Sequence, residues 1–435
     1  MSSEWRLIKV KDLGTIVTGR TPPGGESDYY GEEIPFLTPS DFGDLRKVEI
    51  TGRRLSKTGA ERMSKTLVSS GVGISCIGWQ MGKAILIDQP TITNQQINSI
   101  IIAAENIEKC FVYYSLSIRR SEFFTLGSGG SRTPILNKTD FGNLDFLLPP
   151  ICEQKAIAHI LGTLDDKIQL NRKTNETLEA MAKALFKSWF VDFDPVRAKA
   201  EGRPTGLPAE ISDLFPDSFE DSELGEIPSG WRVATVGDVV ECVGGSTPST
   251  NEIEYWDGGE YFWATPKDLS SLSEPFLLDT AKKITADGVQ RISSGILPVG
   301  TILLSSRAPV GYVAAACVPV SINQGFIALK SNGLMSSAYL LNWCLSNVQQ
   351  FKDRASGTTF AEISKAAFRP IPLLVPSEQV ARLFSDKAQT LYERVVSTMR
   401  QSTLLAATRD ALLPKLISGE IRIPDAEKML EEVGI

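Results

Sequence analysis

The chain contains few residues of the kinds that enzymes use for catalysis. His159 is the only histidine among 435 residues, so a Ser-His-Asp triad or a His-based metal site lacks its parts. Gly78 to Lys83 reads GWQMGK and partly matches a phosphate-binding loop, but only three residues separate its glycines and Ala84 follows where Ser or Thr is needed. No dinucleotide or S-adenosylmethionine fingerprint follows a predicted strand. The sequence therefore predicts a protein that binds without catalysing a reaction.

Loop residues with hydrogen-bonding side chains form the other chemically useful group, and they occur twice. Arg and Lys suit guanine, Asn and Gln suit adenine, and Ser and Thr suit either base. Asn94-Gln95 recurs as Asn323-Gln324, and Thr21 recurs as Thr247. We therefore predict two sets of residues that contact double-stranded DNA. They are Arg20, Thr21, Gln80, Lys83, Asn94, Gln95 and Arg132 in the first set, and Ser246, Thr247, Lys267, Arg307, Asn323, Gln324 and Thr358 in the second.

A structural interpretation of the same residues stays open. Asn favours turns, so Asn94 and Asn323 could each cap one. The repeated Thr-Pro pairs could likewise be structural, and each residue of the two sets could be an ordinary loop residue. The paired carboxylates Asp165 and Asp166 are expected to be solvated on a helix surface.

These residues belong to a repeat that spans most of the chain. Trp5-Arg6-Leu7 recurs as Trp231-Arg232-Val233, and further pairs follow in the same order with a nearly constant offset in numbering. Such a repeat is much longer than the units of solenoids and propellers, so each copy must be a domain with appendages. Two diverged copies indicate two related tasks on different targets, although duplication for stability alone is an alternative.

Each copy is predicted to begin with an α/β or β-rich head, residues 1–150 and 231–376. Short β-type runs such as Ile100 to Ile102 and Thr301 to Leu304 alternate with turns rich in Gly, Pro, Ser and Thr. The heads are close to neutral. The connecting segment 191–230 has 3 basic and 10 acidic residues and is predicted to be an acidic, Pro-rich linker, with a solvated loop as the plainer interpretation.

After each head the sequence predicts a long helix, in residues 151–190 and 377–435, with coiled-coil spacing. Seam positions alternate steps of four and three, and adding 227 to the first series gives the second. The seam residues are Ile157, Leu161, Leu164, Ile168, Asn171, Asn175, Leu178, Ala182, Leu185 and Trp189, and then Phe384, Ala388, Leu391, Val395, Thr398, Ser402, Leu405, Arg409, Leu412 and Leu416.

A two-fold relation between the copies would pair these helices antiparallel and place the heads at opposite ends. A helix from Cys152 to Phe190 would be roughly 58 Å long, enough to space two heads along successive stretches of one DNA duplex. Packing of each helix on its own head is the alternative. Pro414 is expected to end or kink the second helix near Leu413.

Composition places the chain in the reducing cytoplasm. The six cysteines have no C-x-x-C spacing, which favours buried free thiols over disulfides or zinc ligands. No apolar stretch approaches the about 20 residues needed to cross a bilayer. No basic segment with an apolar run opens the sequence, so export is not expected.

The segments that flank the helices resemble a known family. They are Leu185 to Pro195 (LFKSWFVDFDP) and Leu412 to Ile421 (LLPKLISGEI) after the helices, and Pro149 to Gln154 and Pro376 to Gln379 before them. In these segments, and over its whole length, the chain resembles the specificity (S) subunit of type I restriction-modification systems. The repeat departs from this pattern at one place. Glu378-Gln379 lies 225 residues after Glu153-Gln154, whereas the two seams differ by 227, so the second helix should start differently.

The resemblance implies two target-recognition domains that each read half of a split, asymmetric DNA sequence, joined by an antiparallel pair of helices. It also implies two modification (M) subunits, which methylate adenine N6 with S-adenosylmethionine, and two restriction (R) subunits, which use ATP and Mg²⁺. No cofactor is then expected in this chain, and base flipping belongs to the partners. The alternatives are a protein-interaction scaffold, an enzyme hidden in the heads, or a specificity subunit of a methylase without a restriction partner.

Overall fold

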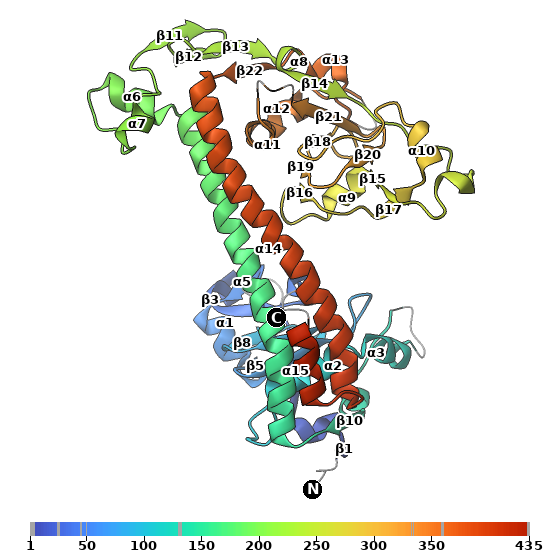
Figure 1. Ribbon diagram of the computed structural model, residues 1–435. Coiled ribbons are helices and arrows are strands. Elements are labelled where there is room, and N and C mark those ends of the chain that lie inside the picture. Colours follow the sequence, from blue (N-terminus) through green and yellow to red (C-terminus); the bar gives the residue numbers. More distant parts are fainter. Residues whose placement is uncertain are drawn as a thin grey trace. The chain divides into compact units, whose positions relative to one another are not determined.

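The computed structural model describes residues 5–23, 27–43, 46–48, 50–128, 133–331, 333, 335–357 and 361–432. The chain divides into two units, residues 1–171 with 401–435 and residues 172–400. Each unit holds one head and part of each of two long helices, α5 (Ile151–Phe190) and α14 (Glu378–Ser418) (Figure 1). The unit boundary therefore crosses both helices.

The head of the first unit is built on two four-stranded sheets, with strand orders β2-β9-β6-β7 and β4-β3-β8-β5. A separate pair, β1 (Arg6–Lys9) with β10 (Asp145–Leu148), closes the head just before α5. The sheet strands are β2 (Thr15–Thr18), β3 (Tyr30–Leu37), β4 (Arg53–Leu55), β5 (Leu67–Val68), β6 (Gly71–Ser75), β7 (Ala84–Ile87), β8 (Thr91–Thr93) and β9 (Ile97–Ile101). The helices are α1 (Lys57–Arg62), α2 (Lys109–Ser117), α3 (Arg120–Gly127) and α4 (Lys138–Gly142).

The head of the second unit repeats this topology with one difference, since its two sheets have five and three strands instead of four each. Its sheets have the orders β14-β21-β18-β19-β16 and β17-β15-β20, and β13 (Arg232–Thr235) pairs with β22 (Pro372–Val375). The sheet strands are β14 (Val240–Val243), β15 (Tyr261–Ala264), β16 (Phe276–Leu277), β17 (Lys282–Ile284), β18 (Ile302–Ser305), β19 (Val313–Ala316), β20 (Val320–Ile322) and β21 (Phe326–Ser331). The helices are α8 (Val236–Val239), α9 (Pro266–Ser270), α10 (Ala286–Gln290), α11 (Ser337–Ser346), α12 (Val348–Asp353) and α13 (Lys365–Phe368). The predicted duplication of an α/β head is confirmed.

Equivalent caps hold equivalent turns in the two heads. The N–H and the hydroxyl of Thr38 both donate to Asp41 Oδ2 at 2.7 Å, and Thr265 donates to Asp268 Oδ2 at the same two distances. The second oxygen of each aspartate accepts a backbone N–H from the next strand region, that of Gly52 or Ala281, at 2.8 Å. The Thr-Pro pairs at 38 and 265 are therefore capping motifs.

The two long helices pair antiparallel in each unit, as predicted (Figure 1). In the first unit, the start of α5 (Leu161, Leu164) packs with the end of α14 (Leu412, Leu416) in one core. In the second unit, the end of α5, around Phe186, packs with the start of α14 in another. The apolar seam positions are buried or half-buried in both units. Burial of this stripe accounts for helices far longer than the average in globular proteins.

The polar seam positions form hydrogen bonds across the pair. In the first unit, Asn171 Nδ2 donates to Gln401 Oε1 at 2.9 Å and to Ser402 Oγ at 3.1 Å. In the second unit, the hydroxyl of Thr398 donates to Asn175 Oδ1. In the repeat, Asn171 is equivalent to Thr398 and Asn175 is equivalent to Ser402. The pair Asn171–Ser402 in the first unit is therefore the counterpart of the pair Thr398–Asn175 in the second. Both asparagines are buried, and polar residues that form hydrogen bonds across a helix pair favour one register.

The two helices begin at equivalent positions of the repeat, Ile151 and Glu378, but the contacts at their starts differ, as the sequence predicted. Trp5 Nε1 donates to Glu153 Oε2 at 3.0 Å, and the buried Gln154 carboxamide accepts from Glu108 N–H at 2.8 Å. Trp231, the repeat partner of Trp5, has a buried indole N–H without a hydrogen-bond partner among the described residues. Contacts at the start of α5 therefore do not carry over to α14.

Pro414 does not end the second helix, so that part of the prediction was wrong. Helix α14 continues through Pro414 to Ser418. The residue is exposed, so the ring stands on the solvent side, where water can satisfy the carbonyl that loses its partner. A further helix, α15 (Ile423–Glu432), follows and buries Ala426 in the core of the first unit.

The acidic segment 191–230 is folded, which contradicts its interpretation as a solvated loop. It contains α6 (Asp194–Ala200), α7 (Ala209–Ser212) and a hairpin of β11 (Phe219–Ser222) and β12 (Gly225–Pro228). Four of its side chains join the core of the second unit, where Trp189 and Trp231 are also buried. They are Phe193, Val196, Phe215 and Ile227. The acidic residues lie between these apolar positions, which a count of charges cannot reveal.

In the first unit, a charged network joins the head to the helices. Tyr114 OH donates to Asp165 Oδ2 at 2.6 Å, and Arg409 Nη1 donates to Asp165 Oδ1 at 2.6 Å. Arg46 pairs with Asp166 and donates to Tyr114 OH at 3.3 Å. The Asp165 side chain is only 12% exposed. The expectation that it is solvated was wrong, because the head covers this face of α5.

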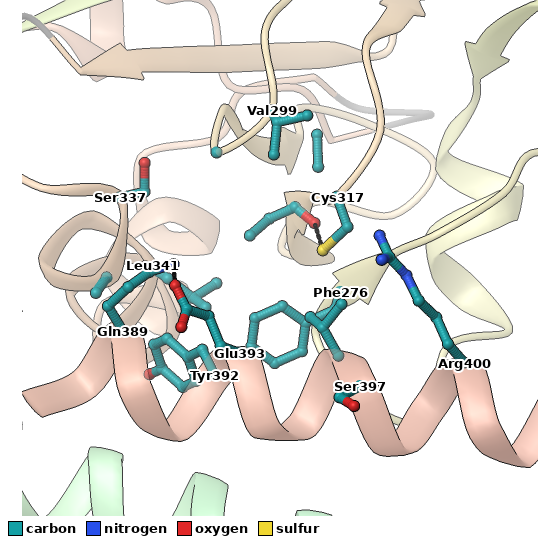
Figure 2. A pocket seen from close by; sticks show the side chains of 15 residues that line it. Phe276, Val299, Cys317, Ser337, Leu341, Gln389, Tyr392, Glu393, Ser397 and Arg400 are labelled. Carbon is teal, nitrogen blue, oxygen red and sulfur yellow. Dashed lines mark hydrogen bonds between the residues drawn. The ribbon is translucent and has the colours of Figure 1, made fainter.

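In the second unit, the same joint is mostly uncharged. Tyr392, the counterpart of Asp165, accepts a hydrogen bond from Asn342 Nδ2 at 2.5 Å. Beside it lies a cavity of about 380 Å³. Figure 2 shows its lining, with Gln389, Tyr392, Glu393, Ser397 and Arg400 from α14 and Phe276, Leu341 and Cys317 from the head. Equivalent positions thus hold the heads to the helices by different chemistry.

We predict that Thr398→Val lowers the free energy of unfolding by about 1–3 kcal/mol, because it leaves the buried Asn175 carboxamide oxygen without its donor. Thr390→Val is the control, since Thr390 is exposed on the same helix and its hydroxyl donates only within the helix, to Asp386 O at 2.9 Å. Urea denaturation measures both. Equal losses in the two variants would show that the cross-helix bond adds nothing.

Burial, with the nearby charges of Glu274 and Glu176, raises the pKa of Glu179 to about 7. A folded-state pKa above the unfolded value makes ionisation costly in the folded state, so stability falls between about pH 4.5 and 7 and stays lower above that. We predict that Glu179→Gln raises the free energy of unfolding at pH 8 by an amount of order 1 kcal/mol, since the carboxyl is partly open to solvent, and has little effect on it at pH 4. Glu210 is exposed, so the control variant Glu210→Gln should not change the free energy of unfolding at pH 4 or at pH 8. A stabilisation at pH 4 equal to that at pH 8 would rule out the ionisation penalty.

Candidate nucleic-acid interface

Three chain segments converge at one edge of each head. In the first head, the loop after β2 is tied to the end of β8 by Arg20 N–H, which donates to Thr93 O at 2.8 Å. The turn from β8 to β9 is tied to the end of β6 by Cys76 N–H, which donates to Gln96 O at 2.7 Å. The second head repeats both bonds. Ser246 N–H donates to Ile322 O at 3.1 Å and Ser306 N–H donates to Gly325 O at 2.8 Å.

The structure brings the predicted Thr and Gln residues together. Thr21 Oγ1 donates to Gln95 Oε1 at 2.5 Å, and Thr247 Oγ1 donates to Gln324 Oε1 at 2.5 Å. Both glutamines are exposed. The threonine fixes the orientation of the carboxamide and leaves its NH₂ group and one oxygen lone pair open. In the major groove, these two groups match N7 and the N6 amino group of adenine. Each head therefore presents one pre-oriented amide.

The two predicted asparagines cap the turns that carry these glutamines. Asn94 Oδ1 accepts from Gln96 N–H at 3.0 Å, and Asn323 Oδ1 accepts from Gly325 N–H at 2.9 Å. The Asn94 side chain is also buried, and its NH₂ group donates to Gln96 Oε1 at 2.9 Å. Their role in this geometry is to hold Gln95 and Gln324. Direct contact of these asparagines with DNA stays a prediction.

A glycine allows the close approach of the first two segments in each head. A Cβ atom on Gly19 would lie 2.1 Å from Asn94 O, and one on Gly245 would lie 1.8 Å from Ile322 O. Both obstacles are backbone atoms, which cannot rotate away. Glycine is therefore the residue that permits the Thr–Gln bond.

The other predicted residues around the first edge differ in availability. Arg20 is exposed beside Thr21, and Gln80 is exposed in the connection between β6 and β7. Lys83 is half-buried and its ammonium group donates to Phe42 O at 3.0 Å, so part of its hydrogen-bonding capacity is taken. The same connection exposes Trp79, a residue that is 77% exposed and that the sequence analysis did not select.

Around the second edge, Lys267 is exposed at the start of α9, directly after the Thr265 cap. Arg307 follows Ser306 and lies 3.7 Å from Glu362 Oε2. Ser246 donates its hydroxyl to Arg291 O at 3.2 Å, so it supports the loop. Arg132 of the first set and Thr358 of the second lie outside the described residues.

The sequence analysis also missed a pair of basic residues in each head. Arg53-Arg54 on β4 and Lys282-Lys283 on β17 stand at the same places in the repeat. An alignment that treats Arg and Lys as equivalent would have found them. They lie on strands, whereas the described residues that the sequence analysis selected lie outside the strands.

Cysteine thiols of both heads lie buried in the protein interior. Burial raises the pKa of Cys76 to about 12 and that of Cys242 to about 11, which keeps both thiols protonated. Of the six predicted buried thiols, three are buried, Cys110 and Cys317 are half-buried and Cys152 is exposed. Within the described ranges, no three His, Cys, Asp or Glu side chains gather as metal ligands. In the same part of the chain, no helix is long and apolar enough for a membrane span.

The sequence matches the profile of the family described as "Type I restriction modification DNA specificity domain" over residues 2–180 and 228–388. The two matches cover most of the chain, and each contains one head. The chain belongs to this family. The resemblance found in the sequence is thereby confirmed.

Individual relatives agree with the family assignment. The chain is 25% identical over 433 residues to the type I restriction enzyme MjaIX specificity subunit of Methanocaldococcus jannaschii, covering 97% of this chain and 94% of that protein. It is 28% identical over 352 residues to the HindI specificity subunit of Haemophilus influenzae, covering 70% and 76%. The crystal structure of the S subunit from M. genitalium matches with a TM-score of 0.60 at 15% identity, covering 95% of this chain and 96% of that one. That likeness supports the fold.

We predict that Gly19→Ala and Gly245→Ala each lower the free energy of unfolding by roughly 2 kcal/mol or more, because backbone must move to admit the methyl group. Gly43→Ala is the matched control, since a Cβ at Gly43 meets nothing within 4 Å. Thermal denaturation measures the three variants. If Gly19→Ala and Gly245→Ala are as stable as Gly43→Ala, the close approach is not a constraint.

Proposed function

We propose that this chain is the specificity subunit of a type I restriction-modification complex and reads a bipartite DNA sequence through its two heads. The observation that carries the proposal is the Thr–Gln pair, which stands at the same edge of both heads with the same 2.5 Å bond. The family profile covers both of these heads. The neighbours of the pair differ, with Arg20 in one head and Ser246 in the other, which favours two different half-sites and an asymmetric sequence.

The chemistry of the complex would reside in its partners. Two M subunits with S-adenosylmethionine would methylate adenine, and two R subunits with ATP and Mg²⁺ would translocate and cut DNA. The single histidine of this chain supports a non-catalytic role. The paired helices are the surface proposed for the M subunits, because they form the element that is shared by the two units. A methylase without an R subunit is the alternative assembly.

Expression of the chain with the M subunit encoded beside it tests this function. N6-methyladenine is mapped across the host DNA by single-molecule sequencing, with and without the gene. A split motif with a constant gap that disappears with the gene is the expected result. If the assembled complex methylates DNA and no motif depends on this gene, the chain does not specify the sequence.

We predict that Gln95→Ala relaxes the recognised sequence in one half-site only and that Gln324→Ala relaxes it in the other. Loss of a bidentate amide costs about 1–3 kcal/mol of discrimination at its base. Gln349→Ala is the control, because Gln349 is exposed on α12 and its NH₂ group donates to Asp353. Methylation maps of the three variants decide the matter. Changes in both half-sites from either single variant would contradict independent reading.

A further inference from the structure

An aromatic pair with a cation on it occurs at the same place in both heads. In the first head, the rings of Tyr30 and Phe36 lie edge to face at 6.5 Å, and Arg53 Cζ lies 5.8 Å from the first ring centroid and 5.2 Å from the second. In the second head, the rings of Trp256 and Trp263 lie edge to face at 4.9 Å, and Lys282 Nζ lies 5.3 Å from the Trp256 centroid.

The strand register shows that the two clusters are equivalent. Arg53 stands opposite Phe36 in the pairing of β4 with β3, and Lys282 stands opposite Trp263 in the pairing of β17 with β15. Both β4 and β17 are the outermost strands of their sheets. Their cations are therefore on an exposed edge, and both side chains are exposed.

The segments around these cations are basic although the heads are close to neutral. Residues 53–65 carry five basic residues and one acidic residue, and residues 282–294 carry three and one. Arg291 Cζ lies 5.6 Å from the Tyr255 ring centroid. Arg62 occupies the corresponding position of the first head, because it follows Arg53 by nine residues and Arg291 follows Lys282 by the same number. Among the residues that the structure describes, no carboxylate forms an ion pair with Arg53 or Lys282.

Hydrogen bonds tie the second cluster to the candidate interface. Trp263 Nε1 donates to Ser246 O at 3.4 Å, and Trp256 Nε1 donates to Ser249 O at 2.9 Å. Arg291 O accepts the Ser246 hydroxyl at 3.2 Å. The loop that carries Thr247 thus lies against the same cluster that holds Lys282 and Arg291.

A cation held on an aromatic face keeps its N–H groups available while its freedom is reduced, which suits it for binding a fixed anion. The stability it adds at an exposed site is small, about 0.5–1 kcal/mol. Phosphate contacts of this kind position a protein on DNA and carry no base information.

We propose that Arg53 with Arg62 in the first head, and Lys282 with Arg291 in the second, bind DNA phosphates beside each half-site and thereby position the reading edges. This inference rests on the proposed function. It assigns to these residues the sequence-independent part of DNA binding, and leaves base selection to the edges that carry Gln95 and Gln324.

The test uses the complex of this chain with its M subunits. Its affinity is measured for a duplex with the recognised motif and for an unrelated duplex, over a series of salt concentrations. The variants are R53Q/R62Q and K282Q/R291Q. Each lost phosphate contact removes about 0.9 from the slope of log affinity against log salt, so each double variant should lose close to two units. Affinity for both duplexes should fall by the same factor, about tenfold or more, and the methylated motif should not change.

The charge-conserving variants R53K and K282R should bind as the wild type does, and K138Q/K352Q, which removes one exposed cation of each head away from the clusters, should leave the slope unchanged. Melting temperatures check that each complex is folded. A folded R53Q/R62Q or K282Q/R291Q complex with the wild-type slope would overturn the phosphate assignment, as would a change in the methylated motif. A wild-type complex that binds neither duplex would instead overturn the proposed function.

Discussion

The burial of one apolar stripe on each of two long helices is the constraint on which the rest of the structure depends. Each unit's core contains side chains from α5 and α14 that are far apart in sequence, such as Leu164 with Leu412 in the first unit and Phe186 with Phe384 in the second. Neither head has a complete core without both helices. Folding of a head and pairing of the helices are therefore one process, and the polar pairs Asn171–Ser402 and Asn175–Thr398 fix its register.

The duplicated heads share a frame that depends mainly on the backbone. The caps at Thr38 and Thr265, the glycines at 19 and 245, and the bonds of Arg20 and Ser246 all act on main-chain groups. Side chains outside this frame can change without moving it. That freedom explains how the joint to the helices can be a charged network around Asp165 in one unit and an uncharged contact at Tyr392 in the other.

Much of this could be predicted from the sequence, because the repeat samples the same structure twice. The helices followed from their spacing, and Thr21, Gln95, Thr247 and Gln324 followed from identical residues in the two copies of the repeat. Two of the errors have a common cause in tertiary packing. Burial of Asp165 depends on the head that covers α5, and the folding of segment 191–230 depends on four apolar residues among ten acidic ones. Arg53 and Lys282 were missed because the repeat keeps their charge and not their identity.

The two heads share a backbone frame but carry different side chains around it, and this arrangement allows one fold to read two different sequences. Under the proposed function, the Thr–Gln bond orients an amide before DNA arrives, so less conformational entropy would be lost on binding. Because this bond is common to both heads, it cannot by itself distinguish their half-sites. The distinction must come from positions where the frame is the same and the side chains differ, such as Arg20 against Ser246 and Ser40 against Lys267. Exchanges at those positions should change which bases are read, whereas exchanges at the shared positions should weaken reading in that half-site altogether.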